Sequence, residues 1–254
     1  MKESQIRRHL DYIYFVQETE DYPMTPKAEA YARDVLDDDL AGDEAVSMII
    51  DEYGLSANSD TSESPDGLYA GSEVFINYLG LRDQQLLDEI ETQIVSVRMA
   101  ELLKGDFEGP FDFDYLKVVH HHLFSDLYPF AGEQRYVSIN QRAMFCLPQY
   151  IGRMAEEIFT KLREDNYLKH QEFEEFVDNL AYYMAEIHAL HPFLDGNTRT
   201  MRIFFHQLAK RAGWRINPSD TNETRLLEAD IAALEGDYQP LIGLLHTAVE
   251  PIDS

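Results

Sequence analysis

A short stretch of the chain, IHALHPFLDGNTRT at residues 187–200, gathers side chains whose types and spacing could do chemistry. It holds a histidine at His191, an acid at Asp195, a Gly-Asn pair at 196–197 and an arginine at Arg199. Histidine, with an unperturbed pKa of about 6.5, can act as a general base at neutral pH. A carboxylate suits Mg²⁺ and an arginine suits phosphate oxygens. The set predicts a site for a magnesium-bound nucleotide with a base beside it.

A helix that begins near Asn197 would complete such a site. Its first backbone N–H groups would lack partners in the helix and, with the helix dipole, would attract a phosphate. Gly196 would let the backbone approach that phosphate closely, and Arg199 and Arg202 would occupy neighbouring positions on the helix. The alternative is a tight helix-loop-helix turn that uses Asp195 and Asn197 as caps.

The charge of the chain favours a small anionic ligand over a nucleic acid. The 254 residues carry a formal net charge of -26, which repels a phosphate backbone, so we expect no direct contact with nucleic acid. Residues 188–216 differ, with five arginines and lysines and one acid, giving 5 - 1 = +4. The alternative explanation of this basic segment is an ordinary cationic helix surface.

Composition also indicates the compartment. A single cysteine, Cys146, excludes an internal disulfide and suits a reducing environment. No apolar run approaches the roughly 18 residues of a membrane-spanning helix, and residues 1–21 have no signal-peptide core. We predict a cytoplasmic protein with no membrane contact.

Helical periodicity predicts a mainly α fold. Apolar residues recur every three or four positions in several segments, namely 6–13, 86–100, 116–123, 173–187 and 201–208. Residues 132–148 alternate loosely instead and predict a small β-hairpin. A polar, aperiodic stretch predicts a linker, so we divide the chain into a helical segment at 1–57, a linker at 58–67 and a core at 68–254.

The segment HPFLDGNTRTMR resembles the signature of Fic-domain proteins, His-x-Phe-x-Asp/Glu-Gly-Asn-Gly-Arg-x-x-Arg. Further blocks follow in the family's order: 71–91 resembles the start of the Fic core, 120–135 its central helix and following loop, and 136–145 its flap. The resemblance covers most of the chain after the linker. It implies a Fic-type helical bundle with a small β-hairpin flap, and transfer of AMP from ATP to a Tyr, Thr or Ser hydroxyl of a target protein.

The resemblance also implies a role for each signature position. His191 corresponds to the base that deprotonates the target hydroxyl, and Asp195 to the Mg²⁺ ligand. The nucleotide would be bound by the backbone of Gly196, Asn197 and Thr198, by Arg199 on the phosphates and by Arg202 on the γ-phosphate. The target segment would be bound by strand addition to the flap at Val137, Ser138, Ile139 and Asn140.

Thr198 departs from the signature, which has its second glycine there. A β-branched residue is costly where φ is positive, but it fits where the backbone is helical. We expect the helical case because every other signature position is intact. One alternative function is a nucleotide-binding module that lost its chemistry through Thr198, and the intact His191 argues against it. Another is a Fic-fold enzyme that transfers a different phosphate-containing group.

Residues 10–50 resemble the small helical antitoxins that inhibit Fic toxins, whose inhibitory helix reads Ser/Thr-x-x-x-Glu-Gly/Asn. Aligning 25–36 with the second antitoxin helix places Glu20 on the inhibitory glutamate, with Val16 and Asp21 at the flanking motif positions. The resemblance implies a self-inhibited enzyme in which this glutamate pairs with the second signature arginine. It also implies type II topoisomerase subunits as targets. The alternative is a helical segment that only packs on the core.

Overall fold

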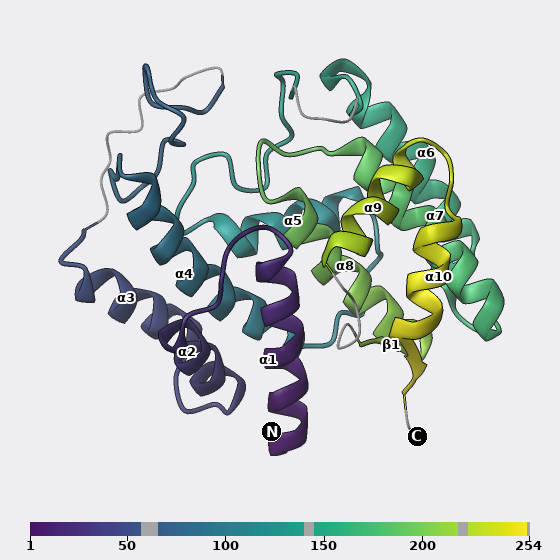
Figure 1. Ribbon diagram of the computed structural model, residues 1–254, viewed down its shortest axis with the longest axis horizontal. Coiled ribbons are helices and arrows are strands. Elements are labelled where there is room, and N and C mark those ends of the chain that lie inside the picture. The colour runs from purple at the N-terminus through teal and green to yellow at the C-terminus, as the bar shows by residue number, and fades with distance from the viewer. Residues whose placement is uncertain (57–65, 140–144, 218–222, 253–254) are drawn as a thin grey trace. The chain divides into compact units, whose positions relative to one another are not determined.

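The computed structural model describes residues 1–56, 66–139, 145–217 and 223–252 (Figure 1). Within these ranges the chain forms ten α-helices, two 3₁₀ turns and two short strands. The elements are α1 (Glu3–Glu18), α2 (Pro26–Leu36), α3 (Gly42–Glu52), α4 (Gln84–Lys104), α5 (Phe113–Phe124), η1 (Pro148–Tyr150), α6 (Ile151–Glu164), η2 (Asn166–Leu168), α7 (Phe173–Leu190), α8 (Asn197–Ala212), β1 (Trp214–Ile216), α9 (Glu223–Leu234), α10 (Gln239–Ala248) and β2 (Val249–Pro251). The predicted mainly α fold is confirmed.

The chain divides into two compact units. One contains Met1–Gly105 and Val118–Glu133, and the other contains Asp106–Lys117 and Gln134–Ser254. Most of the predicted linker at 58–67 lies outside the described residues, so the boundary there stays a prediction. No helix in the described ranges is long and apolar enough to cross a membrane.

In the first unit, α4 is covered by the three N-terminal helices α1, α2 and α3. Every residue of α4 from Glu91 to Ala100 is buried, which is typical of a helix enclosed on all sides. The Gln17 side chain of α1 donates to the Thr92 carbonyl and to Ser96 Oγ of α4, at 3.1 and 3.0 Å. The N-terminal helices therefore share one core with α4.

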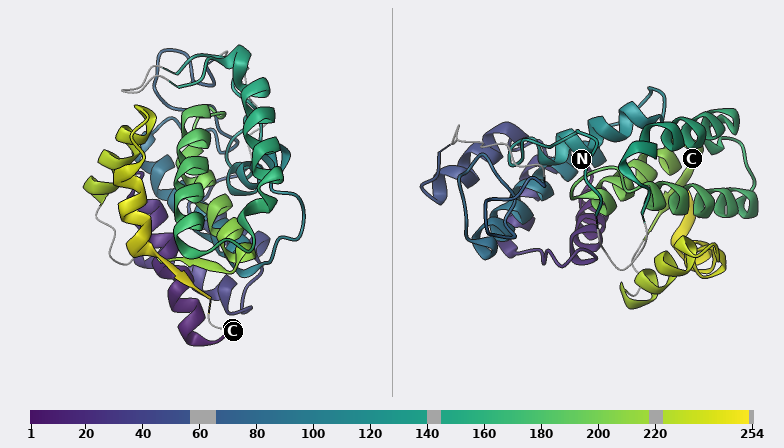
Figure 2. Two further views of the ribbon diagram at one scale, coloured as in Figure 1. Left: turned by 90° about the vertical axis from the view of Figure 1, so that its right-hand side faces the viewer. Right: turned by 90° about the horizontal axis from the view of Figure 1, so that it is seen from above.

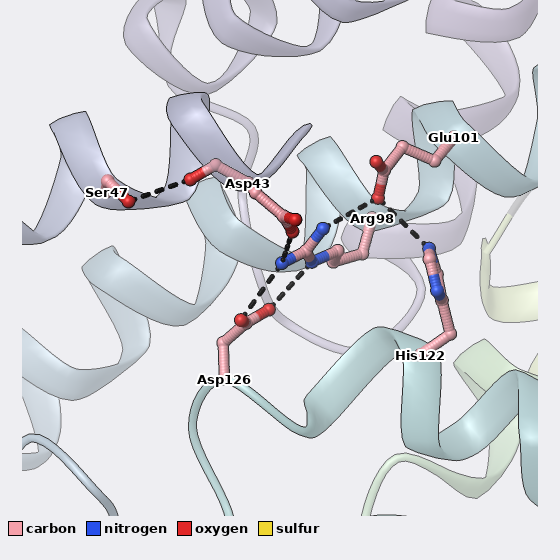
Figure 3. Close-up of polar contacts among 6 residues, drawn as sticks. All are labelled: Asp43, Ser47, Arg98, Glu101, His122 and Asp126. Atoms are coloured by element: carbon pink, nitrogen blue, oxygen red, sulfur yellow. Dashed lines mark hydrogen bonds and ion pairs between the residues drawn. The ribbon is translucent and has the colours of Figure 1, made fainter. Parts of the chain in front are cut away.

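An ion cluster around Arg98 of α4 adds polar links within this unit (Figure 3). The buried Arg98 guanidinium contacts Asp126 at 2.7 Å, Glu101 at 2.9 Å and Asp43 of α3 at 2.9 Å. His122 of α5 lies 3.1 Å from the same Glu101 oxygen. Because the cation is buried and bonded on three sides, losing one carboxylate should cost more than it would at an exposed pair.

In the second unit, α7 is the central helix, with α6, α8, α9 and α10 packed against it (Figures 1 and 2). Rings of Phe111, Phe159 and Phe204 meet edge to face in its core, at centroid distances of 5.3 and 5.9 Å. At the end of α8, Gly213 takes a φ of 95° and turns the chain into β1, which pairs antiparallel with β2. The two helices that flank the signature loop are thus fixed on several sides.

The hairpin predicted over 132–148 has no strand in its described residues. Val137, Ser138 and Ile139 lie outside any strand, and Asn140 lies outside the described residues. The carbonyls of Val137 and Cys146 accept hydrogen bonds from the Arg135 side chain. Residues 140–144, in the middle of the predicted stretch, lie outside the described residues, so the hairpin stays a prediction. The observed antiparallel pair is β1 with β2, elsewhere in the chain.

Candidate active site

The signature loop joins the end of α7 to the start of α8. His191 ends α7 with left-handed backbone angles, φ 43° and ψ 63°, while its N–H still bonds the Ile187 carbonyl at 3.2 Å. At the other end of the loop, Gly196 takes a φ of 68°. Glycine adopts this conformation freely, but histidine does so at a cost in free energy, a strain often found at functional sites. The two turns direct the chain from one buried helix into the next.

The side chain of Asn197 holds the signature loop in its conformation. Its side chain forms two hydrogen bonds with one backbone unit: Oδ1 accepts from Phe193 N at 2.9 Å and Nδ2 donates to Phe193 O at 3.0 Å. The Phe193 side chain is buried beneath the loop. The helix α8 begins at Asn197, and its N-cap residue Gly196 makes no side-chain cap hydrogen bond, so Asn197 anchors the loop instead of capping the helix. This leaves the N-terminus of α8 suited to an anion.

Thr198 lies in the first turn of α8, and its φ is not positive. The expectation of a helical backbone at this departure from the signature is therefore confirmed. The side chain needs no left-handed conformation, so the missing glycine causes no backbone strain.

Replacing Thr198 by glycine should have little effect on the nucleotide site. Because the position is helical, Thr198→Gly should destabilise the protein by no more than about 1 kcal/mol. ATP affinity, measured by titration calorimetry, should change by less than tenfold, or about 1.4 kcal/mol. A tenfold or larger gain in affinity would show that threonine impairs the site, and would favour the nucleotide-binding module.

The His191 side chain occupies an apolar position. It is 7% exposed, and its ring stacks on that of Phe145 with a centroid distance of 3.7 Å. Burial lowers its pKa to about 3, and the nearby His188 and Arg135 act in the same direction. Within the described residues, Nδ1 of His191 has no hydrogen-bond partner. His191 is therefore neutral at neutral pH.

This lowered pKa predicts that the folded protein loses stability as the pH falls from about 6.5 towards 3. In that range the unfolded chain binds a proton at His191 that the folded chain excludes, whereas above it both states are neutral and the contribution vanishes. Urea unfolding at pH 7 and pH 4.5 should show a smaller loss for His191→Gln than for the wild type. Equal losses would contradict a buried, neutral His191.

The signature arginines lie beside acidic groups at distances longer than a hydrogen bond. Arg199, 1% exposed, has Nη2 at 3.8 Å from Asp195 Oδ2, and Arg202 has Nη2 at 3.7 Å from Asp230 Oδ2 of α9. Sequence reasoning missed Asp230, which is 28 residues from Arg202 in a helix with no motif. The structure thus places Asp195 beside Arg199, whereas the acid beside Arg202 is Asp230.

Asp195 also decides what kind of cation the site could hold. Its side chain is 37% exposed, and the described residues contain no group of three or more His, Cys, Asp or Glu side chains arranged around a metal. One accessible carboxylate is too few ligands for a site made of protein alone. It fits Mg²⁺, which often keeps its water and takes phosphate oxygens as ligands.

Sequence reasoning also missed Arg135, whose side chain is 2% exposed. Its Nε donates to the His191 carbonyl at 2.7 Å, Nη1 to the Val137 carbonyl at 2.9 Å and Nη2 to the Cys146 carbonyl at 2.6 Å. No periodicity or charge pattern distinguishes this arginine from an exposed one. The available signal was its place at the end of the block that resembles the loop after the central Fic helix.

Comparison with known proteins agrees with this geometry. Residues 110–209 match the sequence profile of the Fic/DOC family. A probable protein adenylyltransferase of Sinorhizobium fredii is 35% identical over 175 residues, which cover 68% of this chain and 90% of the relative. The chain belongs to the Fic/DOC family. The probable protein adenylyltransferase Fic of Escherichia coli is 32% identical over 175 residues, covering 68% of this chain and 86% of the relative.

Solved structures confirm the Fic fold. The BepC protein of Bartonella tribocorum, a VirB-translocated effector solved with bound AMPPNP, has a TM-score of 0.69 and 25% sequence identity. The match covers 75% of this chain and 99% of that one. The Fic/DOC relatives are protein adenylyltransferases, and the prediction of an enzyme of this class is confirmed by that homology.

The predicted inhibitory residue lies in the first unit, outside the unit that contains the signature. Glu20 is half-buried in the turn that follows α1, and its N–H bonds the Gln17 carbonyl at 3.1 Å. The next residue, Asp21, takes a φ of 61°. The helix α2 begins as predicted, with Thr25 Oγ1 accepting from Ala28 N at 3.1 Å. A pairing of Glu20 with Arg202 stays a prediction.

Proposed function

We propose that this Fic/DOC protein transfers AMP from ATP to a hydroxyl group of a target protein, with His191 as the general base. The observation that supports this most strongly is a buried, neutral histidine one short loop away from an uncapped helix N-terminus. A neutral imidazole has a lone pair that can take up a proton, and the first backbone N–H groups of a helix can bind phosphate.

The reaction needs one proton acceptor and one leaving group. The hydroxyl oxygen of the target attacks the α-phosphorus of ATP, the bond from that phosphorus to the bridging oxygen breaks, and pyrophosphate leaves. The hydroxyl proton moves to His191. Mg²⁺, held by Asp195 together with phosphate oxygens, would offset the negative charge of the nucleotide.

The nucleotide would lie along the start of α8. Backbone N–H groups of Gly196, Asn197 and Thr198 would bind the α- and β-phosphates. Arg199 would contact the phosphates, and Arg202 the γ-phosphate. The Asn197–Phe193 hydrogen bonds support this assignment, because they hold the loop backbone in one conformation before any ligand binds.

The target segment would bind at the flap, at Val137, Ser138, Ile139 and Asn140, by backbone hydrogen bonds. The acceptor would be a Tyr, Thr or Ser hydroxyl, since His191 can deprotonate any of them once the acceptor is positioned. Type II topoisomerase subunits remain the proposed targets on the basis of the antitoxin resemblance, and a cytoplasmic location would give access to them.

The N-terminal segment would restrain the enzyme through Glu20. Two features of the chain support the alignment behind this proposal. Asp21 has the left-handed conformation that Gly and Asn adopt most readily, and these are the residues that the antitoxin motif has there. Thr25 caps α2 at the position that the alignment requires. A carboxylate on Arg202 would exclude the γ-phosphate and disfavour the productive pose of ATP.

Labelled ATP tests the proposed reaction and separates it from its alternatives. Purified bacterial type II topoisomerase subunits would be incubated with this protein, Mg²⁺ and ATP labelled at the α- or the γ-phosphate. AMP transfer places the α-label on protein. The γ-label on protein would indicate phosphate transfer instead, and ATP binding with neither label transferred would favour a nucleotide-binding module.

A further inference from the structure

Arg135 is a buried cation whose guanidinium bonds, in the described part of the chain, go to backbone carbonyls. Three different N–H groups reach three carbonyls, those of His191, Val137 and Cys146. Burying a charge without a counter-charge is unfavourable, and burial accordingly lowers the pKa of the Arg135 guanidinium. A buried arginine bonded to backbone carbonyls is expected where those bonds fix the positions of functional segments.

The three carbonyls belong to the two parts of the proposed active site. One is that of His191, the base, and the other two are those of Val137, at the start of the flap, and Cys146, the residue that follows the flap block. Two backbone hydrogen bonds link the same segments. The N–H of Arg135 donates to the Pro192 carbonyl at 2.8 Å, and the N–H of Cys146 donates to the Ala189 carbonyl at 2.9 Å. The Arg135 guanidinium therefore links the chain at Val137 and at Cys146 to the signature loop.

The left-handed backbone of His191 explains why its carbonyl needs a partner. Because His191 leaves the helix at the end of α7, its carbonyl has no place in the helical hydrogen-bond pattern. Arg135 Nε supplies the missing donor at 2.7 Å. Beside Cys146, the Phe145 ring stacks on the His191 ring, so the side chain of the base is also placed by the segment that Arg135 binds.

We propose that Arg135 is a positioning residue that sets the base and the target-binding flap together, so that the two keep a fixed relation during the reaction. This inference rests on the proposed function for its catalytic part. An arginine suits the role because its planar fork fixes the direction of several donors at once, whereas the compact ammonium of a lysine does not.

The test compares Arg135→Lys and Arg135→Met in the full chain, with Arg211→Lys as the matched control. Arg211 is in the same unit, donates to the Gly109 carbonyl and stacks on Phe111, so it holds a loop away from the signature. AMP incorporation is measured from α-labelled ATP into whichever protein the wild type labels. ATP affinity and the urea unfolding midpoint show whether each variant is folded.

A second readout needs no catalysis. Cys146, the single cysteine of the chain, lies at the Arg135 fork, so its rate of alkylation by iodoacetamide reports how firmly that part of the chain is held. In Arg135→Lys, which keeps the charge, we expect alkylation to rise about tenfold and AMP transfer to fall about 100-fold, since a displacement of about 1 Å can cause such a loss. ATP affinity should stay within about twofold, and Arg211→Lys should match the wild type.

The pH profile of kcat adds a readout that a merely structural role would not move. In Arg135→Met the acid limb should shift to higher pH, because a charge that opposes protonation of His191 is gone. Transfer and alkylation rates of Arg135→Lys within twofold of the wild type would overturn the proposal, and so would loss of transfer in Arg135→Lys without faster alkylation. Alkylation is compared in Arg135→Lys alone, because the Arg135 charge itself lowers the pKa of the Cys146 thiol. If the wild type transfers nothing, the proposed function fails, and the alkylation rates alone decide whether Arg135 holds the flap.

Discussion

Replacement of His191 by alanine should lower the rate of AMP transfer by about 10²–10⁴, the usual contribution of a positioned general base. ATP should still bind, because phosphate binding is assigned to the start of α8 and to the signature arginines. The expected signature is thus a loss in kcat at nearly constant nucleotide affinity. The measurement is the initial rate of label incorporation from α-labelled ATP, with ATP affinity determined in parallel.

His246→Ala is the matched control. This histidine lies on α10 in the same unit, with its side chain 35% exposed and paired with Glu174 at 3.1 Å. Its replacement should leave transfer unchanged. If His191→Ala transferred AMP at the wild-type rate, another group would have to accept the proton, and the assignment of the base would be wrong.

Replacement of Glu20 by glycine should raise the rate of AMP transfer strongly. A carboxylate on Arg202 would occupy the cation that should bind the γ-phosphate and would bring a negative charge to the place of a polyphosphate. A segment held within the same chain has an effective concentration on the order of millimolar, so weak contacts keep it in place. An increase of about 100-fold would correspond to a restrained state populated about 99% of the time.

Initial rates would be compared for the wild type, Glu20→Gly, Glu18→Gly and the double variant Glu20→Gly/Arg202→Ala. Glu18 is the matched control, since it is an exposed acid at the end of α1 and its replacement removes the same charge. Only Glu20→Gly should transfer AMP faster than the wild type. The double variant should be slow, because it lacks Arg202, which is needed to bind the γ-phosphate after Glu20 is removed. Equal rates for the wild type and Glu20→Gly would rule out the inhibitory role, and activation by Glu18→Gly would reduce it to a general charge effect.

The sequence was informative where chemistry and local structure depend on neighbouring residues. The order of residues from His191 to Arg202 predicted a loop between two helices, an N-terminus at the start of α8 and a helical Thr198. Thr25 followed by Pro26 is a pattern typical of a helix start, and in the structure Thr25 caps α2. Each of these depends on spacing along one segment, which periodicity and motif patterns report directly.

Contacts between distant segments were not predictable in this way. Arg135 bonds a carbonyl 56 residues away, and Phe145 stacks on a ring 46 positions further along the chain. The local pattern also gave no sign that the Val137 carbonyl accepts a hydrogen bond from the Arg135 side chain. A single sequence does not show which of several possible donors will bond a given backbone carbonyl.

The enclosure of α4 by the three helices before it has a consequence for how this enzyme could be switched on. A separate inhibitor can dissociate or be degraded while leaving a folded enzyme, but here removal of residues 1–57 would expose the apolar surface of α4 and invite aggregation. Proteolytic loss of the segment is therefore a poor route to activation. If Glu20 restrains the enzyme as proposed, release should instead come from a local rearrangement around Glu20 that leaves α1, α2 and α3 on α4. Each molecule would then carry its own inhibitory segment, at a fixed ratio of one to one.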